Sequence, residues 1–215
     1  MTISAGMIKD LRNKTQAGML DCKKALEASK GDFEKSIEWL RAKGLSSAGK
    51  KSDRIAAEGG ITSYIHAGGS MGVLLEVNSE TDFVAKNESF KDFCKDLSLH
   101  IVAQKPLYVK EEDVPAKDIE KEKSVLKAKA LEEGKKPEFL DKILNGQINK
   151  WLSDVCLMKQ KFVKDPDVTI EDVLKTTIAT LGENIVIRRF VRWELGEGLE
   201  KKKEDFAAEV KAQLN

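Results

Sequence analysis

The strongest constraint on the fold is that the spacing of apolar residues changes twice along the chain. Up to about residue 44 they recur every three or four positions, as in amphipathic helices. In residues 59–80, GGITSYIHAGGSMGVLLEVNSE, two runs rich in β-branched and aromatic residues flank a Gly-Gly-Ser turn, which predicts a β-hairpin. Helical spacing returns in residues 89–104, SFKDFCKDLSLHIVAQ. The pattern therefore predicts an α+β protein in which a sheet is flanked by helices.

Residues 1–44 predict a bundle of three short helices. The helices are expected to begin after Ser4, Gly18 and Asp32. Gly44 is expected to end the third helix in a left-handed C-cap. A bundle of this size is only marginally stable by itself. Residues 45–58, LSSAGKKSDRIAAE, contain Ser and Gly, are basic, and predict a partly helical linker.

Residues 59–198 are expected to form the core, with a helical hairpin inserted at about residues 117–161. Two charge-dense helical stretches flank the turn GKKP, where Gly134 ends one helix and Pro137 opens the next. The later stretch NIVIRRFVRWEL predicts a third antiparallel strand, so the sheet has three strands. One face of that strand is predicted to carry Ile185, Ile187, Val191, Trp193 and Leu195. Residues 199–215 are expected to form a charged amphipathic C-terminal helix.

Composition argues against several classes of function. The 215 residues include 37 basic and 36 acidic side chains, and a formal charge of +1 gives no overall attraction to nucleic acid or anionic membranes. No apolar run approaches the ~20 residues that span a bilayer. The first residues, MTISAGMIKDLRNKT, lack the apolar segment of a signal peptide. We therefore expect a cytoplasmic protein.

The residue types that catalysis or metal binding requires are scarce. The cysteines Cys22, Cys94 and Cys156 are far apart, and two histidines are too few to complete a metal site with them. No phosphate-binding GxxxxGK[ST] loop occurs, and no Ser/His/Asp or Cys/His arrangement is recognisable. We therefore expect a protein that is not an enzyme and that holds neither cofactor nor metal.

The stretch SETDFVAKNESF places an acid and a large aromatic, Asp82 and Phe83, on the bend between a strand and a helix. In one interpretation Thr81 or Asp82 caps the helix and Phe83 packs beneath it. In the other, the pair protrudes as a wedge for another protein. Spacing alone favours the packed interpretation.

Two adjacent apolar residues, Met19 and Leu20, stand at the start of the second expected helix. Neighbours on a helix point about 100° apart, so one of them is expected to be exposed, close to Arg12 and Lys23. Helix geometry alone does not separate a partner-binding role from a packing role between helices.

Three stretches give the chain a recognisable identity. They are LRNKTQAGMLDCKKALEASKGDFEKSIEWLR, LLEVNSETDFVAKNESF and LGENIVIRRFVRWELGEGLEKKKEDFAAEV. They closely resemble the elongation factor Ts family over nearly the whole chain, although the family has Ile where Leu181 stands. The resemblance implies a guanine-nucleotide exchange factor for elongation factor Tu. It also implies an N-terminal bundle similar to ubiquitin-associated domains, a sheet-containing core, a protruding coiled-coil hairpin and a C-terminal helix.

The resemblance also implies three sets of partner-binding residues. The wedge, which in this family enters the GTPase domain near its magnesium site, corresponds here to Thr81, Asp82, Phe83 and Val84. The N-terminal contacts correspond to Arg12, Met19, Leu20 and Lys23, where the family often has a second Met in place of Leu20. The family's hairpin histidine corresponds to His66, whose partner domain and chain of origin stay open.

The chain departs from longer family members, which have two similar core halves. It has strands for only one sheet, and three strands make a thin sheet for this length. It therefore resembles the short single-core form, in which two chains associate and bind two copies of elongation factor Tu.

Two other classes of function are weighed against this one. A ubiquitin-binding adaptor, suggested by the bundle alone, leaves the TDFVAKN bend unexplained. An RNA- or ribosome-binding protein, suggested by Lys50, Lys51 and Arg54, conflicts with the balanced charge and the lack of interleaved aromatic and basic residues. An enzyme of small-molecule metabolism has the least support.

Overall fold

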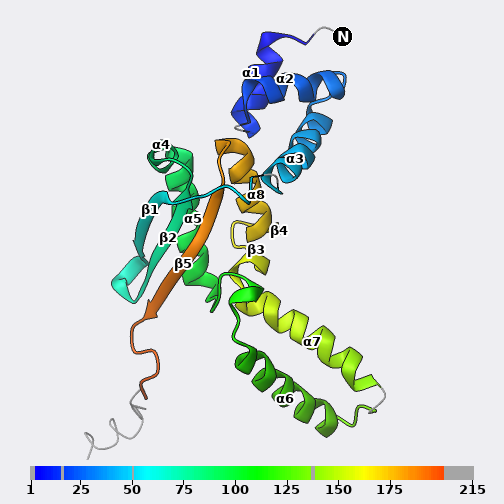
Figure 1. The fold of residues 1–215 in the computed structure, drawn as a ribbon, viewed down its shortest axis with the longest axis vertical. Coiled ribbons are helices and arrows are strands. Elements are labelled where there is room, and N and C mark those ends of the chain that lie inside the picture. Colours follow the sequence, from blue (N-terminus) through cyan, green and yellow to red (C-terminus); the bar gives the residue numbers. More distant parts are fainter. Residues whose placement is uncertain (1–2, 16, 50, 137–138, 201–215) are drawn as a thin grey trace, which may run out of the picture.

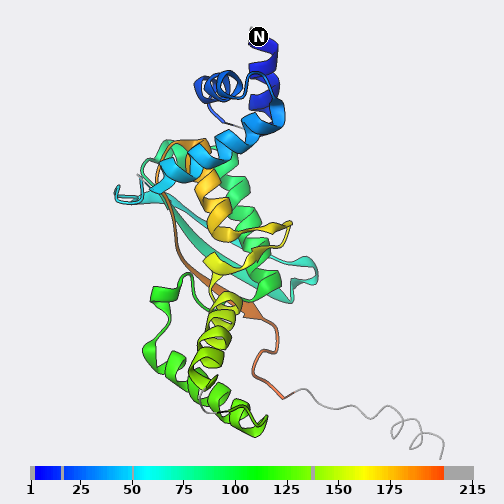
Figure 2. The ribbon, with the colours of Figure 1, turned by 90° about the vertical axis from the view of Figure 1, so that its right-hand side faces the viewer.

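The structure is a computed structural model that describes residues 3–15, 17–49, 51–136 and 139–200. Its parts follow one another along a single long axis (Figure 1, Figure 2), with the N-terminal helices at one end and a helical hairpin at the other. The sheet and its covering helices lie between them. The expected C-terminal helix lies outside the described residues from residue 201 onward.

The N-terminal helices form the expected three-helix bundle. They are α1 (Ala5–Thr15), α2 (Met19–Ala28) and α3 (Phe33–Gly49), packed around Leu11, Cys22, Ala25 and Leu26. The prediction that Gly44 ends the third helix is wrong, because α3 continues to Gly49. Gly44 instead lies where α3 packs against α8 (Ile170–Leu181), and a Cβ added there would be 3.0 Å from the Cβ of Ala179. The sequence alone does not distinguish a glycine that permits close helix packing from a glycine that ends a helix, which is why the prediction failed.

The predicted three-stranded antiparallel sheet is confirmed. Its strands are β1 (Glu58–Ile65), β2 (Met71–Ser79) and β5 (Ile185–Glu194), in the order β1-β2-β5. The single-turn 3-10 helix η1 (Ala67–Gly69) joins the first two strands. A second, two-stranded sheet of β3 (Lys161–Phe162) and β4 (Asp165–Thr169) precedes α8, and the sequence pattern did not indicate it.

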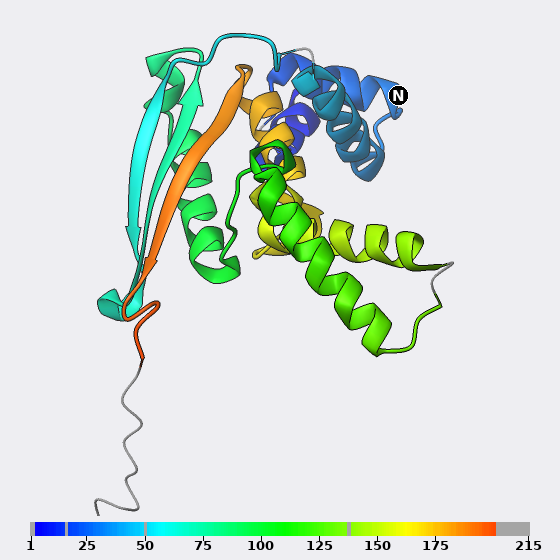
Figure 3. The same ribbon diagram turned by 60° about the horizontal axis from the view of Figure 1, so that its bottom comes forward.

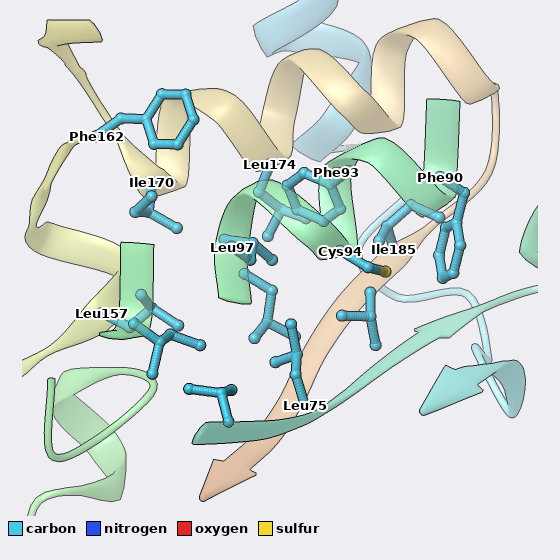
Figure 4. Close-up of a cluster of buried hydrophobic side chains, with 14 of the residues drawn as sticks. Leu75, Phe90, Phe93, Cys94, Leu97, Leu157, Phe162, Ile170, Leu174 and Ile185 are labelled. Carbon is cyan, nitrogen blue, oxygen red and sulfur yellow. The ribbon is translucent and has the colours of Figure 1, made fainter. Parts of the chain in front are cut away.

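Helices α5 (Glu88–Gln104) and α8 lie on the same side of the main sheet, and its other face is uncovered in the described part of the chain (Figure 3). The space between sheet and helices is filled by apolar side chains (Figure 4). The labelled members of this core are Leu75, Phe90, Phe93, Cys94, Leu97, Leu157, Phe162, Ile170, Leu174 and Ile185. The helical spacing in residues 89–104 is thus the inner face of α5.

A β-bulge in β5 changes the predicted face of that strand. Glu76 pairs with Arg189 while the next residue, Val77, pairs with Ile187, so Arg188 has no opposite residue on β2. An extra residue reverses the alternation of side chains beyond it. Ile185 and Ile187 are buried, but Val191, Trp193 and Leu195 are exposed. The prediction that all five share one face is therefore wrong.

The inserted helices form the expected hairpin. Helix α6 (Ala116–Glu132) and helix α7 (Leu140–Val155) pack together, and Gly134 has a φ of 72° just after α6. The 3-10 turns η2 (Glu111–Asp113) and η4 (Leu157–Lys159) connect the hairpin to the core. Pro137, expected to open the second helix, lies outside the described residues.

A buried polar network links the hairpin to the core. His100 on α5 is fully buried, and its Nδ1 accepts a hydrogen bond of 3.2 Å from the Val163 N–H. Its Nε2 must then carry the proton, which it donates to Gln160 Oε1 at 3.0 Å. The Gln160 side-chain amide donates to the carbonyls of Asp154, at the end of α7, and Gln104. Burial lowers the pKa of His100, opposed by its bond to Gln160.

This network predicts acid sensitivity. Since His100 binds a proton less readily when folded, the stability it contributes is complete above its ordinary pKa of 6.5 and is lost as the pH falls below that value. The loss approaches about 1.4 kcal/mol per pH unit for one proton. We expect chemical unfolding to show that the free energy of unfolding falls more between pH 7.5 and pH 5.0 in wild type than in His100→Asn. Equal losses would contradict a neutral, buried His100.

Candidate functional site

The wedge residues lie on a bend between β2 and α5. After Ser79, residues Asp82–Ala85 form one helical turn, α4, and the chain then breaks before α5. Asn87, whose Oδ1 accepts from the Ser89 N–H at 2.8 Å, caps α5. The interpretation in which Phe83 packs beneath the helix is wrong, because its side chain is 79% exposed. The separate turn α4 carries Phe83 outward before the buried face of α5 begins.

Asp82 is held in its charged form beside the exposed ring. Lys86 Nζ lies 2.6 Å from Asp82 Oδ2 and 5.9 Å from the centroid of the Phe83 ring. The hydrogen bond from Lys86 lowers the pKa of Asp82, with a smaller opposing effect of burial. The bend therefore presents an ionised carboxylate and a large apolar surface side by side, while Val84 is partly buried against the core.

Thr81 fixes the backbone where the bend begins. Its side chain makes no helix cap, contrary to one expectation. Its Oγ1–H and N–H donate instead to the Glu183 carboxylate, at 2.6 and 3.0 Å. The Thr81 carbonyl accepts from Ser79 Oγ at 2.8 Å. The first residue of the wedge is thus hydrogen-bonded through its N–H, its hydroxyl and its carbonyl.

The N-terminal residues form a separate exposed surface. Met19 and Leu20 are 58% and 63% exposed, so both project outward where one was expected to. They are the first two residues of α2, and the bundle core begins only at Cys22, one turn further. Arg12 on α1 and Lys23 on α2 are also exposed, with Lys23 Nζ 3.8 Å from Glu27. We name these four residues the N-terminal surface.

His66 lies apart from the wedge. It follows the last residue of β1, whereas the wedge follows the last residue of β2, and the two strands are antiparallel. Eight paired residues therefore separate them, roughly 25 Å along the sheet. The His66 ring is partly buried, and its Nδ1 is hydrogen-bonded to the Tyr64 hydroxyl at 3.1 Å. Figure 1 shows α4 at the end of the sheet nearer the N-terminal bundle, and the turn between β1 and β2 at the opposite end of the sheet.

The uncovered sheet face is a surface that the sequence analysis missed. It carries six exposed apolar side chains, Ile61, Ile65, Leu74, Val186, Val191 and Trp193. Between them Glu76 accepts from Arg188 and Arg189, at 2.8 and 2.6 Å, and these hydrogen bonds lower its pKa. The signal was present as alternating apolar residues in each strand. The bulge at Arg188 concealed it, because it moves the end of β5 onto the open face.

The cysteines take no part in these surfaces. Cys22, Cys94 and Cys156 are free and buried. Burial raises the pKa of Cys94 and Cys156 to about 11, so their thiols are mostly protonated at neutral pH. Within the residues that the structure covers, no three His, Cys, Asp or Glu side chains gather as a metal site would require. No helix among them is long and apolar enough to cross a membrane.

Comparison with known proteins decides the family. The sequence profile described as elongation factor TS matches residues 48–197. The chain belongs to the elongation factor Ts family. It is 57% identical over 214 residues to elongation factor Ts of Citrifermentans bemidjiense, covering 100% of this chain and 99% of that protein. It is 56% identical over 212 residues to that of Carboxydothermus hydrogenoformans, covering 99% and 98% of the two chains.

A third relative, elongation factor Ts of Heliobacterium modesticaldum, is 52% identical over 213 residues, which span 99% of each chain. The assignment made from the three quoted stretches is thereby confirmed. These relatives of matching length also fit the short single-core form of elongation factor Ts.

The exposure of Phe83 makes a prediction about stability. Phe83→Ala is expected to change the free energy of unfolding by less than about 0.5 kcal/mol, because the ring touches little of the fold. Phe90→Ala, which removes a buried ring seven residues away, is expected to cost about 3–5 kcal/mol. Urea denaturation of both variants measures this contrast. Comparable losses would mean that Phe83 belongs to the core.

Proposed function

We propose that this elongation factor Ts chain promotes release of GDP from elongation factor Tu by inserting Asp82 and Phe83 near the partner's magnesium site. The observation that carries the proposal is an exposed aromatic beside an ionised carboxylate on a bend with a fixed backbone. Apolar side chains of this size are seldom held in water unless a partner covers them. The factor performs no bond chemistry and needs no cofactor of its own, so it is not an enzyme of a chemical reaction.

Exchange follows from a difference in affinity. Elongation factor Tu binds GDP through its phosphate-binding loop and Mg²⁺, which share the charge of the phosphates. A factor that binds the nucleotide-free GTPase more tightly than the GDP-bound form must weaken GDP by the same factor. A coupling of about 4 kcal/mol corresponds to roughly a thousandfold weaker GDP binding.

The two wedge side chains have different parts in this proposal. Phe83 supplies apolar area and shape between elements of the partner, and burying it contributes roughly 1.5–3 kcal/mol. Asp82 brings negative charge to the groups that hold Mg²⁺, so that the ion and then GDP leave. Lys86 neutralises Asp82 in the free factor, and its contact with the carboxylate competes with contacts to the partner.

The remaining coupling energy comes from anchoring contacts. Met19 and Leu20, flanked by Arg12 and Lys23, offer an apolar centre with a basic rim, the usual composition of a protein interface. Helix α2, which carries Met19, Leu20 and Lys23, lies in the same half of the molecule as α4, so the two surfaces suit a single GTPase domain. His66, at the far end of the sheet, suits a different domain of the partner.

Fluorescent GDP bound to elongation factor Tu gives the direct test. Wild type is expected to accelerate its release, and Phe83→Ala is expected to lower the maximal release rate by about tenfold or more. Affinity for the nucleotide-free GTPase should fall less, because the anchoring surfaces remain. Phe139→Ala, which removes an exposed ring on the helical hairpin, is the matched control and should behave as wild type. Equal losses of rate and affinity in Phe83→Ala would make Phe83 an anchor.

We further infer that two chains associate through their open sheet faces and bind two copies of elongation factor Tu in the cytoplasm. Each face has apolar residues on all three strands, and stacking two such sheets would bury them in a sandwich. The wedge, on the bend beyond the end of β2, remains accessible in that arrangement. Neither a membrane nor a nucleic acid is required.

Substitution on the open face tests the association. Trp193→Glu places a charge among the exposed apolar residues and is expected to convert the dimer into a monomer in light scattering of the purified factor. Val125→Glu, at an exposed apolar site on α6, is the control and should leave the mass unchanged. A wild-type protein that is monomeric at all accessible concentrations would refute the dimer.

A further inference from the structure

The turn between α8 and β5 holds the wedge bend from a distant part of the chain. Glu183 in this turn accepts both hydrogen bonds from Thr81, a residue 102 positions earlier. These bonds are charge-assisted, and bonds to a carboxylate are roughly twice as strong as neutral ones. Val84 and Ala85 pack against the core on the inner side of the bend, while the bonds to Glu183 tie Thr81 to a turn distant in sequence.

The turn that carries Glu183 is itself firmly fixed. Gly182 ends α8 in a left-handed C-cap with φ of 80°, and its N–H bonds to the Ile178 carbonyl at 2.9 Å. Asn184 is 3% exposed, and its N–H donates to Glu80 Oε1 at 2.6 Å. Its side-chain amide donates to the carbonyl of Arg54 at 2.7 Å. The turn therefore joins α8, the wedge bend and the linker from the N-terminal bundle.

The wedge cannot fix its own direction. The Phe83 ring is 79% exposed, and Lys86, whose Nζ lies 5.9 Å from the ring centroid, is itself exposed and follows the same turn. The direction of the ring is therefore set by the backbone on either side. Asn87 fixes the far side by capping α5, and Thr81 fixes the near side. If the backbone at Thr81 were loose, Phe83 would have to be ordered during binding. The cost of that ordering would reduce the binding free energy that the ring contributes.

We propose that Glu183 is a positioning residue for nucleotide exchange: its carboxylate holds Thr81 so that Asp82 and Phe83 meet the GTPase in one orientation. The proposal rests on the proposed function and adds a residue outside the predicted wedge. In the proposed role, Glu183 itself does not contact the partner's nucleotide site. It acts through the backbone of Thr81.

A matched control exists at the opposite end of the same helix. Asp172 accepts hydrogen bonds from the Thr169 N–H and Oγ1–H, at 3.0 and 2.9 Å, the same pair of donors that Glu183 receives from Thr81. It closes a capping box at the start of α8, the end opposite to the turn that carries Glu183. Loss of Asp172 therefore perturbs α8 by a comparable change while the wedge bend keeps its contacts.

The experiment compares variants of the full chain in the fluorescent-GDP assay, with the release rate measured against factor concentration. Glu183→Ala is expected to lower the maximal rate about tenfold while the half-saturating concentration changes less than twofold. Asp172→Ala is expected to retain the wild-type rate. Glu183→Gln should restore most of it, since its amide oxygen still accepts from the Thr81 N–H and its amide nitrogen donates to Oγ1. Melting temperatures of all variants identify any general loss of folding.

A double variant separates positioning from a general structural role. If Glu183 acts through the wedge, Glu183→Ala combined with Phe83→Ala should be within about twofold of Phe83→Ala alone, because the ring being positioned is gone. The proposal would be overturned if the rate losses of the two single variants multiplied in the double variant. A wild-type rate for Glu183→Ala, or an equal rate loss for Asp172→Ala, would also overturn it. A wild-type factor that fails to accelerate GDP release would instead refute the proposed function itself.

Discussion

The packing of α5 and α8 against one face of the three-stranded sheet is the interaction on which the other features depend. It buries the inner side chains of β2, such as Leu75 and Val77, and the first part of β5. This core fixes where β2 ends and α5 begins, so the bend between them has a defined place. It also brings the α8–β5 turn beside that bend, although the two are about a hundred residues apart in sequence. Loss of this packing would free the backbone of the wedge bend at both of its ends.

The protein is organised for binding, and its energetics follow from that. One aromatic ring would contribute only a fraction of the coupling that effective exchange needs, so the proposed mechanism requires several surfaces to act together. Surfaces that belong to one molecule act together efficiently, because formation of the first contact raises the effective concentration of the second surface at its own binding site. The linker carbonyl of Arg54 and the wedge residue Thr81 are both held by the α8–β5 turn. That shared support gives the N-terminal surface and the wedge a common frame.

The two faces of the sheet have different roles. The inner face, with α5 and α8, makes the monomer stable. The outer face leaves Trp193, Leu74 and Ile61 in water, an arrangement that association of two chains would relieve. The thiols of Cys22, Cys94 and Cys156 are free and buried within the fold.

Local patterns in the sequence predicted most of the helices and the main sheet, and resemblance of three stretches predicted the family. The β-hairpin, the spacing in α5 and the bundle core of Cys22, Ala25 and Leu26 follow from periods that a short segment sets by itself. The motif TDFVAKN suggested an exposed wedge through resemblance, whereas spacing around it favoured a buried Phe83. A local pattern describes which side of an element is apolar, but it does not show whether a neighbour covers that side.

Tertiary structure decided the features that involve two distant segments. Gly44 permits the contact of α3 with α8 because Ala179 lies opposite, and nothing near Gly44 in sequence signals that contact. The bulge at Arg188 depends on the register between β2 and β5, so it determines the exposed face only once the strands pair. Glu183 reaches Thr81 because the core closes a loop of about a hundred residues. Sequence thus determined the periodic elements and the family, while the partners and exposure of individual side chains required the fold, since both depend on residues remote along the chain.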